Sequence, residues 1–193
     1  MLKWLLRIPL LVACFLLVSH ALTAQEVVHA LTGTVNSIDS AAKTITITTD
    51  DGAISTFDQM TGSHKSAGLE KALRNGAVAA DAFNQKGAQV IVFYSGWIEP
   101  RTAIAFQTLG PGPFTTTNGT VEKFDKGNHL LSIKEPSGAI DSIRVAAETV
   151  AETGTGAVDG SRFDPVKGQR VRVTSTQVNG ADKALFINAA FAN

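Results

Sequence analysis

The sequence predicts an all-β protein with a short helix, arranged as two tandem five-stranded OB-like barrels. Three observations lead to this fold class. The chain contains an internal repeat, each copy contains several segments with the alternating pattern of half-buried strands, and a Gly-Pro-Gly-Pro segment separates the copies at residues 110–113.

The repeat is strongest where each copy begins. At an offset of 86 residues nine positions match without a gap, the clearest being Gly33, Thr34 and Val35 with Gly119, Thr120 and Val121. After a middle stretch that is five residues shorter in the second copy, the match resumes at an offset of 81, where Lys86-Gly87 aligns with Lys167-Gly168. Repeats this long are domains and not turns of a solenoid. We therefore expect a signal peptide at 1–24, barrels at 30–109 and 117–190, and a linker at 110–116.

The expected strands follow from runs rich in β-branched residues that are bounded by turn residues. TITITT at 44–49 alternates strictly, and Asp51-Gly52 then supplies a hairpin turn. The first copy is predicted to have strands at 30–38, 44–49, 53–59, 88–95 and 102–109. The second is predicted to have them at 117–124, 129–134, 139–146, 169–176 and 183–190.

A helix is expected between the third and fourth strands of the first copy. Leu69, Leu73, Gly76, Ala80 and Phe83 are spaced by three or four residues, and Ser66 is a suitable N-cap. Three strands, a helical connection and two more strands is the order of an OB-fold barrel. Gly33 fits a position where the first strand bends sharply.

The N-terminus has the pattern of a secretory signal peptide. Lys3 and Arg7 precede an apolar run at 8–18, and small residues follow at 19–24. The run is about half the length of a membrane-spanning helix, so an uncleaved anchor is the less favoured alternative. A second alternative is a lipoprotein, because residues 11–14 read LVAC. The expected location is therefore periplasmic or secreted, with membrane contact only through an uncleaved segment.

Composition excludes several classes of function. Cleavage would remove Cys14, the single cysteine, and with it any disulfide or thiolate chemistry. Removal of Lys3 and Arg7 from 17 basic residues leaves 15 against 17 acidic residues, a formal charge of −2. The predicted second and third strands also lack a basic face with stacking aromatics, so nucleic-acid binding is not expected.

The residues that repeat, GTVNSID and GTVEKFD followed by an alternating strand and a late VKGQRV, resemble small β-barrel repeats of uncharacterised bacterial envelope proteins. The resemblance implies a fold and an envelope setting but carries no catalytic residue. A more distant likeness is to periplasmic copper chaperones, which implies a site of histidine, methionine and tryptophan. Met60 and His64, four residues apart, are the candidate metal ligands, although a core methionine and a solvated histidine are the favoured explanation of this pair.

No catalytic motif points to an enzyme. The metalloprotease, phosphate-loop, dinucleotide and nucleophile-elbow patterns are all missing from the sequence. Ser40 and Lys43 match the SxxK spacing of serine acyl enzymes, but they fall in a predicted hairpin loop where that chemistry lacks its helical geometry. The prediction is a non-enzymatic protein that needs no cofactor.

The positions where the two copies differ predict a contact surface. Val90 and Val92 align with Val171 and Val173 and should point into the barrels. On the opposite face, Ile91 and Phe93 stand where the second copy has Arg172 and Thr174, and Tyr94 and Trp97 follow. An apolar patch of this kind marks an interface. The candidate contact residues for an envelope protein or small apolar ligand are Ile91, Phe93, Tyr94 and Trp97, and packing against the helical segment or the other barrel is the alternative.

Overall fold

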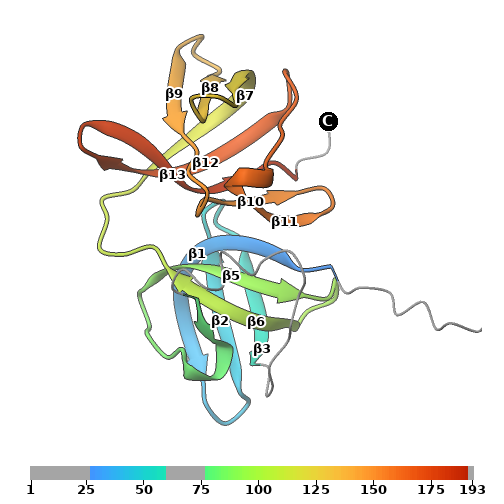
Figure 1. Ribbon diagram of the computed structural model, residues 1–193. Helices are drawn as coiled ribbons and strands as arrows, with labels where there is room; N and C mark the ends of the chain where they lie inside the picture. Colours follow the sequence, from blue (N-terminus) through green and yellow to red (C-terminus); the bar gives the residue numbers. More distant parts are fainter. Residues whose placement is uncertain (1–26, 60–76, 191–193) are drawn as a thin grey trace, which may run out of the picture.

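The computed structural model describes residues 27–59 and 77–190, and these residues form two β-sheets that stack on one another (Figure 1). The predicted all-β fold class is confirmed, because the described residues contain only two 3-10 helices besides strands and turns. We call the two units the first barrel (β1–β6) and the second barrel (β7–β13).

The first barrel is closed by pairing between its third and last long strands. Its strands are β1 (His29–Asp39), β2 (Thr44–Thr49), β3 (Ile54–Gln59), β4 (Val78–Ala79), β5 (Gln89–Ser95) and β6 (Arg101–Thr108). The order is β3-β2-β1-β5-β6-β4, and β3 also pairs in parallel with β6. Five strands therefore form a closed circuit with the connectivity of an OB-fold.

The second barrel repeats this strand order and adds a hairpin. Its strands are β7 (Thr115–Asp125), β8 (Leu130–Lys134), β9 (Ile140–Arg144), β10 (Val150–Thr153), β11 (Gly156–Asp159), β12 (Arg170–Val178) and β13 (Ala181–Asn188). The order is β11-β10-β13-β12-β7-β8-β9, and β13 also pairs with β9 through Lys183 and Arg144. The β10–β11 hairpin lies along β13 on the side that faces the first barrel (Figure 1).

All ten predicted strands are present, with ends that differ by up to two residues. Sequence reasoning did not predict β4 or the β10–β11 hairpin. Of the predicted helix, Ser66, Leu69, Leu73 and Gly76 lie outside the described residues. The described end of that segment forms a single 3-10 turn, η1 (Ala80–Ala82), and a similar turn, η2 (Gly160–Arg162), follows β11.

The repeated glycine lies where the backbones of the first and second strands of each barrel come very close together. A Cβ atom on Gly33 would lie 2.3 Å from the Thr48 carbonyl oxygen, and one on Gly119 would lie 2.3 Å from the Lys134 carbonyl oxygen. Side-chain atoms cannot approach a carbonyl so closely. The repeated glycine therefore serves the close crossing of two strands in each barrel.

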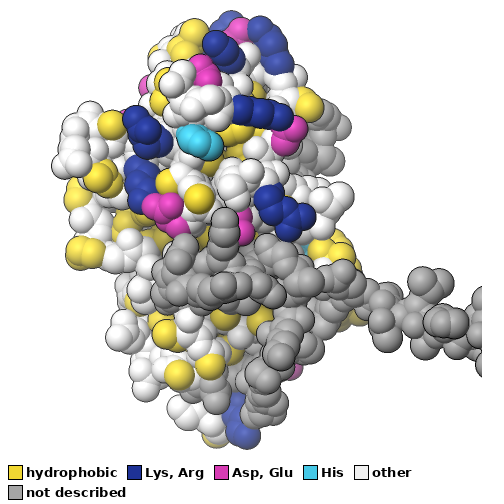
Figure 2. All heavy atoms as spheres, viewed as in Figure 1, with side chains coloured by type: hydrophobic (Ala, Val, Ile, Leu, Met, Phe, Trp, Pro, Cys, Tyr) yellow, Lys and Arg dark blue, Asp and Glu magenta, His cyan; other side chains and the backbone are white. Residues whose placement is uncertain are grey.

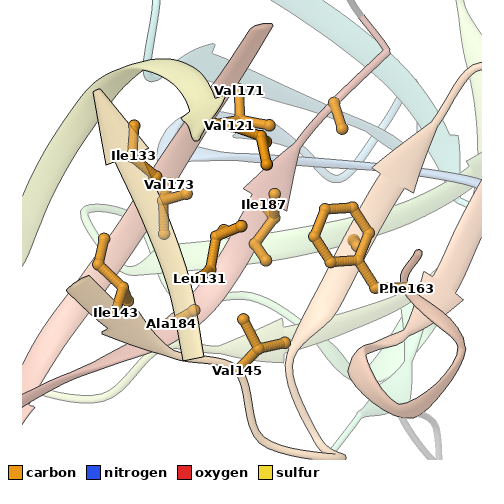
Figure 3. Close-up of a cluster of buried hydrophobic side chains, with 12 residues drawn as sticks. Val121, Leu131, Ile133, Ile143, Val145, Phe163, Val171, Val173, Ala184 and Ile187 are labelled. Carbon is orange, nitrogen blue, oxygen red and sulfur yellow. The ribbon is translucent and has the colours of Figure 1, made fainter. Parts of the chain in front are cut away.

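Each barrel has its own apolar core. Val90 and Val92 point into the first barrel, and Val171 and Val173 point into the second, as the sequence predicts. Figure 3 shows the second core, in which Leu131, Ile133 and Ile187 point toward one another from β8 and β13.

A third apolar cluster joins the barrels. Ile91 and Phe93, on the outer face of the first barrel, are 0% exposed. They pack with Val150 and Phe186 of the second barrel. The Ala157 N–H also donates a 2.8 Å hydrogen bond to the Val28 carbonyl, so β11 is tied to the start of the first barrel. The barrels therefore form one packed unit.

The described residues include no helix with the length and apolar character needed to cross a membrane.

Candidate functional site

A cleft of about 400 Å³ lies between the two barrels. We call it the inter-barrel cleft, and the side chains that define it are His29, Tyr94, Trp97 and Arg101 from the first barrel and Glu152 and Thr174 from the second. Its volume lies within the range of roughly 300–1,000 Å³ that small-molecule sites occupy.

A buried histidine and a buried glutamate meet at one end of the cleft. His29 begins β1, and its Nδ1 lies 2.7 Å from Oε1 of Glu152 on β10. The other carboxylate oxygen, Oε2, accepts a 2.8 Å hydrogen bond from the Ala30 N–H. Burial raises the pKa of the Glu152 carboxyl, while the hydrogen bonds from His29 and Ala30 act in the opposite direction.

Aromatic and cationic side chains surround His29. The centre of the Trp97 ring lies 4.5 Å from the centre of the imidazole, in an edge-to-face arrangement. The centre of the Tyr94 ring lies 5.7 Å from the imidazole centre. On β6, the Arg101 guanidinium lies 5.1 Å from the centre of the Tyr94 ring, which is a cation–π distance. Burial raises the pKa of the Tyr94 hydroxyl, so tyrosine remains protonated at neutral pH.

Two polar atoms at this end are buried without a hydrogen-bond partner. They are Nε2 of His29 and Nε of Arg101. Buried polar groups are nearly always hydrogen-bonded, because an unpaired one forfeits its hydration without compensation. Both residues line the cleft, so a ligand bound at this end could supply the missing partners.

At the opposite end of the cleft, the carboxylates already accept hydrogen bonds from other residues of the protein. Asp50, in the turn after β2, accepts hydrogen bonds from Thr32 at 2.5 Å and from Thr174 of the second barrel at 2.9 Å. The neighbouring Asp51 accepts a hydrogen bond from Thr49, and that bond is the main cause that lowers the pKa of the Asp51 carboxyl. Its Oδ2 also lies 3.9 Å from Arg172 of the second barrel.

The four predicted contact residues have separate positions. Ile91 and Phe93 are buried between the barrels, so the contact they make is with the second barrel of the same chain. Tyr94 is half-buried, and Trp97 is 79% exposed, and both line the cleft. The predicted apolar surface is thus an internal interface over one half and a cleft wall over the other.

The predicted metal ligands, Met60 and His64, lie outside the described residues. Within residues 27–59 and 77–190, no three histidine, cysteine, aspartate or glutamate side chains are placed to hold a metal ion together.

Sequence reasoning missed His29, Arg101 and Glu152 as site residues. A signal for two of them is present, because His29 aligns with Thr115 and Arg101 with Asp182, so both break the repeat as Trp97 does. Glu152 carries no such signal. It falls in the stretch where the copies differ in length, and 123 residues separate it from His29.

The face of the molecule in Figure 2 carries charges of both signs on the second barrel. Within the second barrel, Lys126 forms an ion pair with Asp164, and Lys183 forms one with Glu148. A surface with mixed charges does not strongly attract a polyanion.

No protein-family model matches this chain, and no curated protein matches it. The site is therefore interpreted from its own geometry.

Proposed function

We propose that this protein is a secreted, non-enzymatic binding module of the bacterial cell envelope that takes a small molecule into the inter-barrel cleft. The observation that supports it is the cleft itself, which is formed jointly by two docked barrels and has unpaired buried polar atoms on its wall. A site assembled from two rigid units is preformed, and a preformed site loses little entropy when a ligand binds.

The residues beside the aromatic side chains favour a different ligand from the envelope protein or small apolar ligand that the sequence predicts. Tyr94 and Trp97 offer flat apolar surfaces, but His29, Arg101 and Glu152 beside them are polar. A ligand that buried only hydrocarbon there would leave the unpaired nitrogen atoms unsatisfied. We therefore favour a ligand with one apolar face and several polar groups.

A nuclear magnetic resonance screen of the full chain tests this function. A mixed library of small sugars, aromatic compounds and short peptides should contain compounds that shift the backbone amide signals of His29, Tyr94, Trp97 and Thr174 together. Compounds that bind only away from the cleft, or a library with no binder, would contradict the proposal.

The second candidate is a periplasmic metal-binding protein. The observation that favours it is the His29–Glu152 contact, because a carboxylate beside Nδ1 is a common arrangement for histidines that bind metal through Nε2. Titration with Cu(I) or Ag(I) at micromolar concentration should then change the signals of His29 and Trp97. Unchanged signals would remove this candidate.

The envelope location has its own test. Expression of the full chain in a Gram-negative host should yield periplasmic protein whose N-terminus begins after residue 21 or residue 24. A cytoplasmic chain that retains residues 1–24 would contradict the predicted secretion.

A further inference from the structure

We propose that the ligand of the inter-barrel cleft is a neutral carbohydrate, whose hydroxyl groups donate a hydrogen bond to His29 Nε2 and accept one from Arg101 Nε. This inference rests on the proposed binding function and names the chemical class of its ligand. It follows from the proton positions, the charge and the shape of this end of the cleft.

The proton positions make the His29 nitrogen an acceptor. Both oxygens of Glu152 have a neighbouring donor, since Oε2 accepts from the Ala30 N–H at 2.8 Å and Oε1 lies 2.7 Å from His29 Nδ1. A carboxylate that accepts at both oxygens places the imidazole proton on Nδ1. When the ring is neutral, Nε2 carries a lone pair in this tautomer, and a hydroxyl group can supply the hydrogen-bond donor that it lacks.

Arg101 requires the opposite partner. Its Nε–H can only donate, and it is buried without an acceptor. The His29 and Arg101 side chains both lie against Tyr94, with the imidazole 5.7 Å and the guanidinium carbon 5.1 Å from its ring centre. The cleft wall therefore offers one acceptor and one donor around a single ring. A hydroxyl group donates and accepts, whereas a carboxylate only accepts and an ammonium only donates.

The charge of the cleft does not call for an ionic ligand. Two arginines, Arg101 and Arg172, stand against the three carboxylates Asp50, Asp51 and Glu152. Each carboxylate already has hydrogen-bond donors from the protein. An added anion would lie near these carboxylates, and an added cation would find them occupied by other donors.

Trp97 supplies the flat surface that a sugar ring needs. Trp97 is 79% exposed, and the centre of its ring lies 4.5 Å from the centre of the His29 ring. The C–H face of a pyranose packs on an aromatic ring while the hydroxyls project from its edges. Because 79% of Trp97 is exposed, its ring is accessible to a sugar that enters this end of the cleft.

The test is a calorimetric titration of the full chain with sugars matched in shape and different in charge. Glucose and galactose are compared with glucosamine and galactosamine, which are cationic, and with glucuronate and galacturonate, which are anionic. At least one neutral sugar should bind, at least threefold more tightly than its charged counterparts, and should shift the amide signals of His29, Tyr94 and Trp97. Preference for a charged form, or no sugar binding, would overturn the inference.

Variants then locate the site. Trp97→Ala should weaken binding of the neutral sugar at least tenfold, whereas Trp97→Phe, which keeps an aromatic face, should weaken it less than threefold. Arg101→Lys retains the charge but loses Nε–H, and should weaken binding about fivefold. Ile98→Ala is the matched control, because Ile98 is the exposed neighbour of Trp97, and it should bind as the wild type does.

The two proposals fail in different ways. If an aromatic or peptide compound binds in the cleft and no sugar does, the carbohydrate inference is wrong and the binding function stands. If no compound of any class binds in the cleft, both are wrong. Sugar binding that Trp97→Ala and Arg101→Lys leave unchanged would place the sugar elsewhere and also overturn the inference.

Discussion

His29 of the first barrel and Glu152 of the second lie 2.7 Å apart, buried between the two units. This contact joins the start of β1 to β10, and the Ala30 N–H reinforces it on the other carboxylate oxygen. It connects the docking of the barrels to the wall of the cleft. The effect of Glu152 ionisation on the free energy of unfolding therefore measures how the interface responds to pH.

Glu152→Gln should change the pH dependence of stability in a defined direction. Because burial raises the folded-state pKa of Glu152 above its usual 4.5, its contribution is present below about pH 4.5 and is lost as pH rises through the folded pKa. The wild-type free energy of unfolding, relative to Glu152→Gln, should fall as pH rises from about 4.5 through the raised pKa of Glu152. Urea unfolding at pH intervals of 0.5 measures this difference.

Glu148→Gln provides a control of opposite sign. The hydrogen bond from Lys183 lowers the folded-state pKa of Glu148 below 4.5, so its contribution is present above about pH 4.5 and is lost as pH falls through the lowered pKa. The wild-type free energy of unfolding relative to this variant should therefore fall as pH decreases from about 4.5 through the lowered pKa of Glu148. Slopes of equal sign for the two variants would contradict one of the two assignments.

Ile91→Ala should destabilise the protein far more than Ile54→Ala. Both substitutions remove the same atoms from a strand of the first barrel, but Ile91 is 0% exposed between the barrels and Ile54 is 63% exposed. A cavity at Ile91 should lower the free energy of unfolding by about 3 kcal/mol, whereas the exposed site should change it by less than about 1 kcal/mol. Equal losses in urea unfolding would show that the barrels do not bury Ile91 in solution.

The strands and the inner faces of the barrels could be predicted because their signals are local. Alternation in TITITT identifies a strand without knowledge of its partners, and the matched Val90 and Val171 identify positions that both barrels bury. The outer faces differ between the copies at Ile91 and Phe93, and these residues pack against the second barrel, which was the alternative to contact with a partner or ligand. Periodicity could not show that the surface packed against Ile91 and Phe93 belongs to the second barrel of the same chain.

The site could be predicted only in part because it depends on how the barrels dock. Trp97 and Tyr94 stand out in the repeat alignment, but the position of Glu152 follows from a hairpin, β10–β11, that the first copy does not predict. A contact across 123 residues leaves no spacing pattern in the sequence. The cleft is a product of the packing of two barrels and is absent from each repeat alone.

Asp50 and Thr174 should show energetic coupling across the barrel interface. Thr174 donates a 2.9 Å, partly buried hydrogen bond to Asp50, and a hydrogen bond to a charged acceptor contributes about 1.5–3 kcal/mol. In a double-mutant cycle, Asp50→Asn and Thr174→Val should be non-additive by at least about 1 kcal/mol in urea unfolding.

The matched pair for that cycle is Lys126 and Asp164, which lie 2.8 Å apart with both side chains more than half exposed. An exposed ion pair contributes little because solvent screens it, so the coupling between Lys126→Ala and Asp164→Ala should be below about 0.5 kcal/mol. Additive losses for Asp50 and Thr174 would mean that the interface does not depend on their hydrogen bond.

Gly33→Ala and Gly119→Ala should each destabilise the barrel that contains them. The added Cβ would meet a backbone carbonyl oxygen at 2.3 Å in both cases, so two strands would have to separate. We expect a loss of at least about 2 kcal/mol for each variant in urea unfolding, as for other overpacked sites. Gly127→Ala is the control, since the nearest atom to its Cβ would be Asp125 Oδ1 at 3.5 Å, an ordinary contact. If either strand variant were as stable as the Gly127 variant, the close crossing of the first two strands would not explain why this glycine occurs twice.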